Sequence, residues 1–358
     1  MIPLTLRSSI DGIREDVVLR INLPEAAGPD DGIIETTDEG IIVRHGNATI
    51  SIHGIEPTEM AGDVLFVQPN RGVVQRLIRK NSPHNTFLVT ERCDQLCVMC
   101  SQPPKKTHVD MFGHFSVAAT LAPENAVIGI SGGEPTLYKD DLFGFLKLVG
   151  GIRPDLRFHI LSNAQHFVSD DATFLGSEIG RRVMWGVPLY SDQPATHDLL
   201  VGKTGAFDLL MDGLAILSQS GAHVELRTVL MTTNAQHLPS LANFIASHVP
   251  FADPWAIMQL ENIGFARNRW RSLFYDHSEE FGAVAEAIDL SRAHGIPVRL
   301  YNFPLCTVPT TYRRFAPSTI SDWKRRYEAR CDGCIGRRQC GGFFEWHPDA
   351  MSYRRLGL

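Results

Sequence analysis

Residues 1 to about 80 alternate apolar, often β-branched residues with polar ones in short runs that are separated by turn-forming residues. A two-residue period is typical of strands, because successive side chains of a strand point to opposite faces. The pattern therefore predicts a small β-rich unit over residues 1–85. Its strands are expected at residues 17–23, 32–37, 40–44, 48–52 and 63–67.

From residue 86 the pattern changes to strand, loop and helix, repeated six times up to about residue 295. Strands that alternate with helices imply right-handed β-α-β units and a parallel sheet, so the fold class is α/β. The strands are expected at residues 86–90, 126–131, 157–162, 183–190, 223–231, 255–261 and 297–303. Two helical faces are formed by Leu142, Phe145, Leu146 and Val149, and by Phe207, Leu210, Leu214 and Leu217.

The composition is that of an ordinary soluble protein, with 44% hydrophobic and 21% charged residues. No apolar run approaches the roughly 20 residues that cross a bilayer, and the first residues lack the plan of a secretory signal. A cytoplasmic protein without a membrane partner is therefore expected.

The net charge of −6 is unevenly distributed. Residues 306–358 carry ten Lys or Arg against five Asp or Glu, so this segment is +5 and the remainder is −11. Such a basic patch is a solvated face or a docking surface for an acidic electron donor or an acidic peptide. Nucleic acid is not expected, since no recognisable binding motif accompanies the charge.

Seven cysteines in two tight groups indicate metal ligation in a reducing compartment, because a disulfide framework normally uses an even number. The first group, Cys93, Cys97 and Cys100, follows an expected strand with C-x3-C-x2-C spacing. Three thiolates can hold an iron–sulfur cubane and leave one iron open for a small molecule. The alternative is a zinc loop that is completed by His108 or another distant ligand.

This spacing resembles the signature of the radical SAM superfamily. The resemblance implies a partial (β/α)6 barrel of the TIM type, and a [4Fe-4S] cluster whose open iron binds the amino and carboxylate groups of S-adenosylmethionine (SAM). One electron from that cluster would cleave SAM to a 5'-deoxyadenosyl radical. The chain departs from the usual pattern at Met99, where an aromatic residue normally precedes the third cysteine.

The sequence after the second strand, Gly132-Gly133-Glu134-Pro135, is similar to the motif of this superfamily that holds the methionyl amino group of SAM. Its two glycines allow a close backbone approach, and its carboxylate can accept a hydrogen bond from an ammonium group. A plain turn is the alternative reading of this tetrapeptide.

Further SAM contacts are implied at the ends of later strands, where β/α barrels collect their chemistry. On the fifth strand Glu225 and Arg227 share one face, and a charged pair in an apolar strand needs a partner or a ligand. Arg227 resembles the arginine that meets the SAM carboxylate, and a structural ion pair is its alternative. The other candidates are Ser162, Asn163, Ser191, Ile263 and Gly264; turn or cap roles are equally open for the first three.

Four cysteines remain, Cys306, Cys331, Cys334 and Cys340. Four thiols can satisfy every iron of a second [4Fe-4S] cluster or one zinc ion. Beside a radical SAM core they resemble the auxiliary-cluster extension called a twitch domain, which is placed at residues 296–358 after a barrel at 86–295. The two sites would use all seven cysteines, so no thiol is left to donate a hydrogen atom, which favours an oxidative reaction.

The whole chain resembles the His-Xaa-Ser system radical SAM maturases called HxsC. The resemblance rests on the residues from Cys93 to Lys105 and from Cys331 to Phe344. The resemblance implies a peptide or small-protein substrate with His-Xaa-Ser repeats, an electron donor such as flavodoxin or ferredoxin, and a second radical SAM maturase as a partner. Residues 1–85 would bind the peptide or a partner, or only buttress the barrel. Two alternatives are a radical SAM enzyme that acts on a small molecule or cofactor precursor, and a non-enzymatic iron–sulfur or zinc protein.

Overall fold

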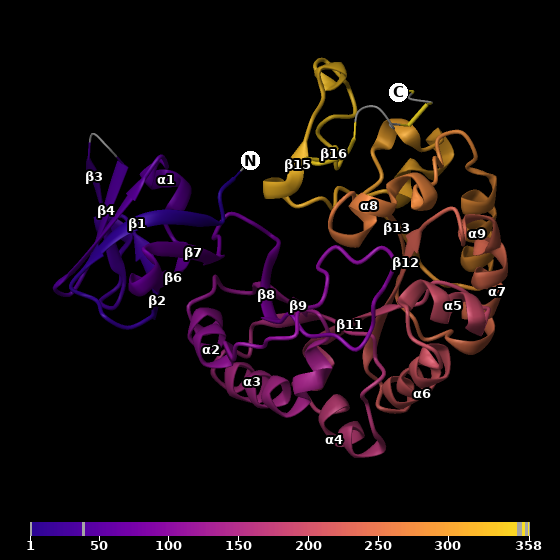
Figure 1. The fold of residues 1–358 in the computed structure, drawn as a ribbon, viewed down its shortest axis with the longest axis horizontal. Coiled ribbons are helices and arrows are strands. Elements are labelled where there is room, and N and C mark those ends of the chain that lie inside the picture. Colours follow the sequence, from indigo (N-terminus) through magenta and orange to yellow (C-terminus); the bar gives the residue numbers. More distant parts are fainter. Residues whose placement is uncertain (1, 38–39, 349–352, 355–356, 358) are drawn as a thin grey trace.

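The structure is a computed structural model of the 358-residue chain, and it describes residues 2–37, 40–348, 353–354 and 357. A small β-barrel occupies one end of the molecule, and a larger parallel sheet with helices on its outer side forms most of the rest (Figure 1). No helix in the described part of the chain is long and apolar enough to span a membrane.

Seven strands close the N-terminal barrel in the order β1-β5-β4-β3-β2-β6-β7. Its core consists of inward-facing aliphatic residues such as Ile21, Ile50, Ile52 and Val67, all of which are fully buried. The strands are β1 (Thr5–Asp11), β2 (Val17–Asn22), β3 (Gly32–Thr37), β4 (Gly40–His45), β5 (Ala48–His53), β6 (Val64–Gln68) and β7 (Val73–Ile78), with one short helix, α1 (Pro57–Met60).

The five strands expected in this region are confirmed as β2 to β6 to within one residue at each end, and β1 and β7 were missed. Only Leu6 of β1 is buried, so that strand has almost no apolar alternation. In β7 the buried face includes Arg76, where alternation would call for an apolar residue. Arg76 is tolerated there because its Nε donates to Asp63 at 2.6 Å and its Nη2 donates to the carbonyl of Glu59 at 2.7 Å.

A parallel sheet of seven strands follows, and its spatial order β14-β13-β12-β11-β10-β9-β8 is the order of the strands along the chain. All six neighbouring pairs are parallel, and β8 and β14 are its two unjoined edges. The expected mixed α/β fold with a parallel sheet is therefore confirmed. The strands are β8 (Asn85–Thr90), β9 (Val127–Gly132), β10 (Arg157–Leu161), β11 (Val183–Pro188), β12 (His223–Leu230), β13 (Trp255–Gln259) and β14 (Val298–Tyr301).

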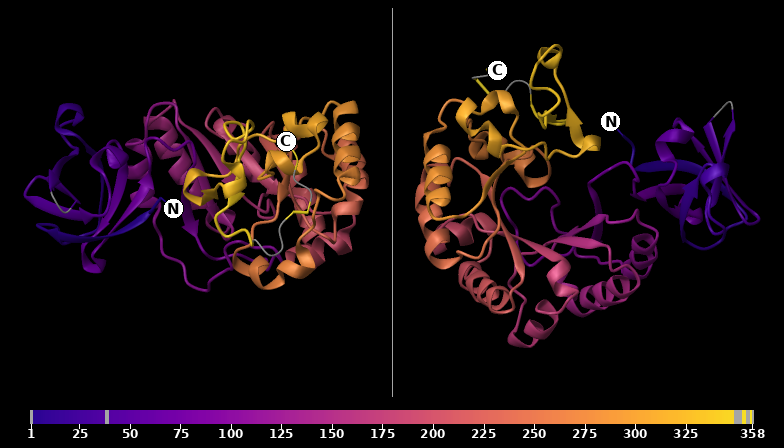
Figure 2. Two further views of the ribbon diagram at one scale, coloured as in Figure 1. Left: turned by 90° about the horizontal axis from the view of Figure 1, so that it is seen from above. Right: turned by 180° about the vertical axis from the view of Figure 1, so that it is seen from behind.

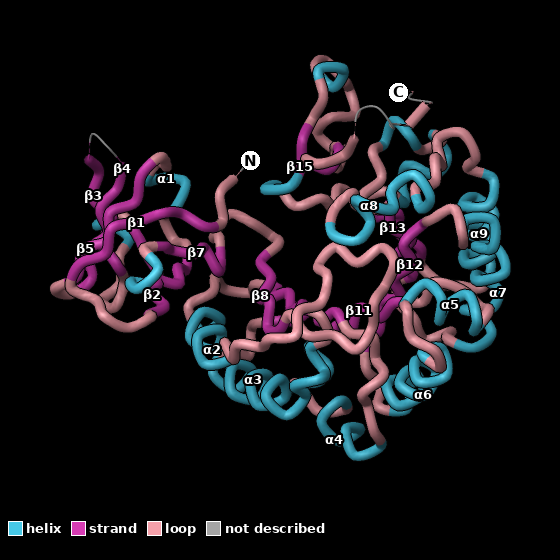
Figure 3. Tube along the Cα trace, in the orientation of Figure 1, coloured by secondary structure: helices cyan, strands magenta, loops and turns pink. Residues whose placement is uncertain are grey.

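Helices cover the outer side of this sheet, so that in Figure 3 they form an arc around its strands. The two helical faces expected from the sequence are confirmed, because every one of their eight residues is buried, on α3 and on α6. The helices are α2 (Phe112–Thr120), α3 (Lys139–Ile152), α4 (Ala172–Leu175), α5 (Pro194–Val201), α6 (Ala206–Gln219), α7 (Leu238–His248), α8 (Gly264–Leu273) and α9 (Gly282–Ala293).

After β14 the chain forms short 3-10 turns and one two-stranded pair, β15 (Arg325–Arg326) with β16 (Phe343–Phe344). This C-terminal segment lies opposite the N-terminal barrel across the open side of the sheet, as the views of Figures 1 and 2 agree. The two regions are joined by Arg79, whose Nη1 and Nη2 donate to the carboxylate of Asp322 at 2.8 and 2.7 Å. A bidentate pair of this kind fixes orientation as well as distance.

Candidate functional site

The first three cysteines lie on one loop, residues 93–100, which follows β8 and is called the cysteine loop below. Its backbone is fixed from two sides. The amides of Leu96 and Val98 donate to the carbonyls of Val201 and Leu200 at the end of α5, at 2.9 and 2.8 Å. The amide of Phe265 in α8 donates to the carbonyl of Cys100 at 2.9 Å. Helices α5 and α8, which follow β11 and β13, thus hold the loop over the carboxyl ends of the strands.

Three glycines allow the rest of the fold to approach the cysteine loop closely. A Cβ on Gly133 would lie 2.0 Å from the carbonyl oxygen of Arg92, next to Cys93. Gly202 and Gly264 have φ of +66° and +58°, and a Cβ on either would lie 2.8 Å or less from a carbonyl oxygen of the loop. The sequence assigned Gly133 and Gly264 to ligand contact, but the structure first gives them a packing role.

The three thiols line one cavity and lie close enough to influence one another electrostatically. Burial raises the pKa of Cys93 to about 12, and burial also raises the pKa of Cys97 and of Cys100. The amide of Gln95 points at the sulfur of Cys93 at 3.4 Å, which favours a thiolate. Buried thiols become thiolates when a metal supplies the compensating charge.

Among the described residues, no group of three or more His, Cys, Asp or Glu side chains is arranged so that it could hold a metal ion. An iron–sulfur cluster makes a different demand, because each thiolate binds a separate iron and the sulfurs surround a shared space. Three thiols around one cavity meet that demand. The donor set therefore fits a cluster.

Glu134 is 1% exposed and ties the end of β9 to the end of β10. Its Oε1 accepts from the amide and hydroxyl of Thr136, at 2.8 and 2.5 Å, and from the hydroxyl of Ser162 at 2.8 Å. Its Oε2 accepts from the amide of Asn163 at 2.6 Å. Burial raises the pKa of Glu134, and these donors oppose that effect. Oε1 accepts three hydrogen bonds and Oε2 accepts one, so Oε2 is the oxygen with acceptor capacity left.

Asp94 links the cysteine loop to the same strand end. Its Oδ1 accepts from Asn163 at 2.9 Å, and its Oδ2 accepts from Lys203 at 2.5 Å and lies 3.3 Å from Nε2 of His166. Burial works to raise the pKa of Asp94, but His166 and Lys203 outweigh it and hold that pKa below its usual range. Asn163 was predicted from the sequence, but Asp94, His166 and Lys203 were missed. Only Asp94, between two cysteines, carried a local signal.

Arg227 forms an ion pair with Glu225 on the inner face of the sheet. Glu225 also accepts from the hydroxyl of Tyr301 at 2.8 Å and lies 3.3 Å from Nε2 of His159. Burial opposes ionisation of Glu225, but His159 and Arg227 lower its pKa to about 2. Arg227 therefore has the structural partner that the sequence left open, and its side chain also lines the cavity.

One cavity of about 1320 Å³ is lined by the three thiols, Glu134 and Arg227, and by residues of all seven strands of the parallel sheet. Its outer wall belongs to the C-terminal segment, which supplies Trp323, Lys324 and Trp346. Lys324 Nζ lies 3.4 Å from Glu261 Oε1 and 5.6 Å from the ring centre of Trp323. No motif in the sequence pointed to this wall.

Ten of the thirteen residues predicted around the first cluster and SAM line this cavity. They are Cys93, Cys97, Cys100, Gly132, Gly133, Glu134, Ser162, Asn163, Arg227 and Ile263. The other three lie outside its lining. Pro135 begins a buried 3-10 turn, Gly264 packs on the cysteine loop, and the hydroxyl of Ser191 accepts from the amide of Gln193 at 3.0 Å, as a turn residue does.

The four C-terminal thiols form a second group, outside this cavity. Burial, with Cys340 and Cys331 nearby, raises the pKa of Cys306 to about 11. The sulfur of Cys340 accepts from the backbone amides of Leu305 and Gly342, both at 3.3 Å. These contacts bring Cys306 and Cys340, which are 34 positions apart in the sequence, to one place.

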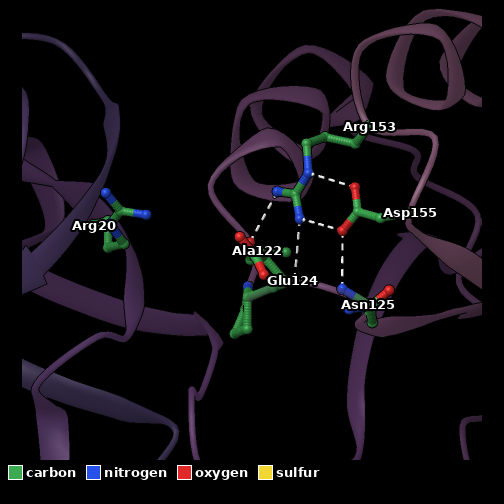
Figure 4. A pocket seen from close by; sticks show the side chains of 7 residues that line it. Arg20, Ala122, Glu124, Asn125, Arg153 and Asp155 are labelled. Carbon is green, nitrogen blue, oxygen red and sulfur yellow. Dashed lines mark hydrogen bonds and ion pairs between the residues drawn. The ribbon is translucent and has the colours of Figure 1, made fainter.

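A smaller pocket of about 440 Å³ lies between the N-terminal barrel and the parallel sheet, where Arg20 faces Arg153 and Asp155 (Figure 4). Arg153 donates to Asp155 and to the carbonyls of Thr120 and Ala122. Hydrogen bonding to Arg153 lowers the pKa of Asp155. Arg153 pairs with Asp155 and Arg20 pairs with Asp31, so the charged groups of this pocket have structural partners.

No family model and no curated protein matches the sequence. Among solved structures the chain is similar to SuiB of Streptococcus suis bound to S-adenosylmethionine, with 14% identity, 60% of this chain and 49% of that chain covered, and a TM-score of 0.49. The structure of SuiB bound to the precursor peptide SuiA is 14% identical, with 60% of this chain and 48% of that chain covered and a TM-score of 0.48. The structure of anSMEcpe with bound AdoMet and a Cp18Cys peptide is 13% identical, with 49% of this chain and 50% of that chain covered and a TM-score of 0.42. The chain spans about half the length of each of these structures.

Proposed function

We propose that this chain is a radical SAM enzyme that modifies a ribosomally made peptide. One observation carries the proposal. Cys93, Cys97 and Cys100 share a cavity with Gly132, Gly133 and Glu134, at the adjoining ends of β8 and β9. A [4Fe-4S] cluster and SAM bound there would supply a 5'-deoxyadenosyl radical, which abstracts hydrogen from the substrate. The open parallel sheet would be the partial (β/α)6 barrel of that superfamily, over residues 86–295.

The roles of the chain's own residues follow from their positions. The cysteine loop would ligate the cluster, and the free acceptor site on Glu134 Oε2 would take the amino group of SAM. Arg227 would meet the SAM carboxylate while it keeps Glu225 as its partner, and Ile263 would pack near the adenine. The mixed wall of Trp323 and Lys324 would face the substrate.

A peptide substrate is supported by the size of the cavity. Small-molecule pockets typically measure about 300–1,000 Å³, and this cavity of about 1320 Å³ exceeds them. The space beyond the cluster and SAM would therefore admit part of a chain. On the family resemblance, the substrate would carry His-Xaa-Ser repeats, and residues 1–85 would bind a peptide or partner.

The four C-terminal thiols would hold a second cluster in a twitch-like segment, residues 296–358, and this cluster would accept the electron lost by the substrate radical. The basic character of this segment would suit an acidic electron carrier such as a flavodoxin or ferredoxin.

Anaerobic reconstitution with iron and sulfide, followed by dithionite and SAM, tests the proposal. We expect about eight irons per chain, from two [4Fe-4S] clusters, and release of 5'-deoxyadenosine. Cys93→Ala should abolish the release of 5'-deoxyadenosine. The matched control, Cys334→Ala, should lose only the second cluster and still release 5'-deoxyadenosine. Release from Cys93→Ala at the wild-type rate would contradict the proposal. About four irons with one bound zinc would assign zinc to the C-terminal thiols.

A further inference from the structure

The cavity reaches both ends of the parallel sheet. At the carboxyl ends of the strands it is lined by the cysteine loop, and at the amino ends by Arg157 and His223. The inside of a closed β/α barrel is normally filled by layers of bulky side chains. Here two inward positions in the middle of strands, Gly129 and Gly186, carry no side chain. Side chains of neighbouring strands, among them Thr86, Leu161 and Arg227, cover these two positions. The cavity, called the passage below, follows the inner face of the sheet between these side chains.

Four basic side chains gather where this passage meets the amino ends of β10, β11 and β12. Arg157 begins β10, Arg181 and Arg182 directly precede β11, and His223 begins β12. The strand register confirms that they are neighbours, because Phe158 pairs with Val183 and Met184 pairs with His223. All four residues line the cavity. They are called the basic mouth below.

The charge of the basic mouth is not neutralised by the described part of the chain. None of its four side chains forms an ion pair with a carboxylate there. Arg182 is held by the carbonyls of Arg153 and Gly150, at 3.3 and 2.9 Å, and Arg181 Nε donates to a carbonyl at 3.2 Å. These bonds position two guanidinium groups without cancelling their charge.

The carboxylate nearest along the passage is already compensated. Glu225 lies between the basic mouth and the cysteine loop, and it is paired with Arg227 and bonded to Tyr301. An anion at the basic mouth would therefore meet Arg157 and Arg181 with little opposing charge, while Arg182 is already bonded to two carbonyls at the end of α3. Guanidinium groups bind carboxylates with charge-assisted hydrogen bonds.

We propose that the basic mouth binds a carboxylate of the substrate, either an acidic side chain or the C-terminus, while the residue to be modified lies at the cysteine loop. The proposal rests on the peptide substrate of the proposed function. The six residues of β9 or β11 span about 20 Å at about 3.3 Å per residue. An extended peptide has the same rise, so the carboxylate would lie about five or six residues from the reacting one.

Fluorescence anisotropy of the full chain with rhodamine-labelled peptides tests this site. The acidic probe is His-Gly-Ser-Gly-Gly-Ser-Gly-Glu amide, the neutral probe ends in Gln amide, and a third ends in Gln with a free carboxylate. At low ionic strength we expect either carboxylate to bind about tenfold more tightly than the neutral probe, as a charge-assisted bond supplies. Whichever probe shows the preference identifies the source of the carboxylate.

The double substitution Arg157→Gln with Arg181→Gln should reduce this preference to less than about twofold. Arg7→Gln, at an exposed position on β1, is the matched control and should keep it. Equal binding of all three probes, or a preference that survives the double substitution, would overturn the proposal. Release of 5'-deoxyadenosine with dithionite and SAM should be unchanged in the double variant. A wild-type chain that shows the preference but no release would contradict the proposed function and leave the site standing.

Discussion

Gly133→Ala separates two explanations of the glycines before Glu134. A Cβ on residue 133 would lie 2.0 Å from the oxygen and 2.4 Å from the carbon of the Arg92 carbonyl, and 2.9 Å from the amide nitrogen of Cys93. These are backbone atoms, so no side chain can rotate away. The cysteine loop or the end of β9 must move, at a cost of about 3 kcal/mol, the upper part of the range for overpacking.

The assay is urea unfolding of the protein without iron or SAM, followed by tryptophan fluorescence, since Trp185 and Trp255 are fully buried in this sheet. Gly144→Ala is the control, because nothing lies within 4 Å of its Cβ on an exposed face of α3. That change should stabilise the protein by about 1 kcal/mol. After reconstitution, Gly133→Ala should bind about four irons instead of eight.

The outcome is decisive because the two explanations differ for the empty protein. If residue 133 is glycine only so that SAM can approach, Gly133→Ala will unfold at the wild-type urea concentration and only SAM binding will weaken. If it is glycine because the cysteine loop packs on it, stability falls before any cofactor is added. Wild-type stability together with full iron loading would refute the packing argument.

Three other predictions concern charged groups. Asp322→Asn should weaken the bond to Arg79 and make the C-terminal segment more sensitive to limited proteolysis, with no change in the unfolding of the N-terminal barrel; an unchanged cleavage pattern would contradict this. The pKa of Glu225 is lowered to about 2. Ionised Glu225 should therefore add about 3 kcal/mol to the free energy of unfolding above pH ~4.5, and this contribution is lost as the pH falls toward 2. The stability difference between wild type and Glu225→Gln should shrink over that window, and a constant difference would argue against it. Arg76→Met should lower the free energy of unfolding in urea by about 3–5 kcal/mol, because it leaves Asp63 buried without its partner. Adding Asp63→Leu to this variant should restore part of the loss. Equal stability of the single and double variants would refute the ion-pair argument.

The sequence predicted the parallel sheet because its strands are short, largely apolar runs that alternate with segments of helical periodicity. Strands such as β11, with Trp185 and Val187 fully buried, are visible as continuous apolar runs between turns. The helix faces were visible for a similar reason, since a repeat of three or four residues survives any change of tertiary context. The cysteine loop was also visible in the sequence, because its three thiols lie within eight consecutive residues.

The rest depended on contacts that have no local signature. Arg79 and Asp322 are 243 positions apart, and neither lies in a motif. The basic mouth consists of side chains from three strands whose adjacency is set by the register of the sheet. Strand β1 was missed because one of its sides faces solvent and only Leu6 is buried.

The packing of Gly133 on the cysteine loop also determines where Glu134 lies in the folded protein. The amide of Glu134 donates to the carbonyl of Arg92 at 2.8 Å, and the amide of Gly133 donates to the carbonyl of Thr90 at 2.8 Å. Backbone that approaches the cysteine loop this closely places Glu134 among the residues that line the cavity of the three thiols. If the glycine is required for this packing, the position of the carboxylate in the cavity lining is a consequence of it. This coupling explains in physical terms why a cysteine loop and a Gly-Gly-Glu turn on the neighbouring strand form one site.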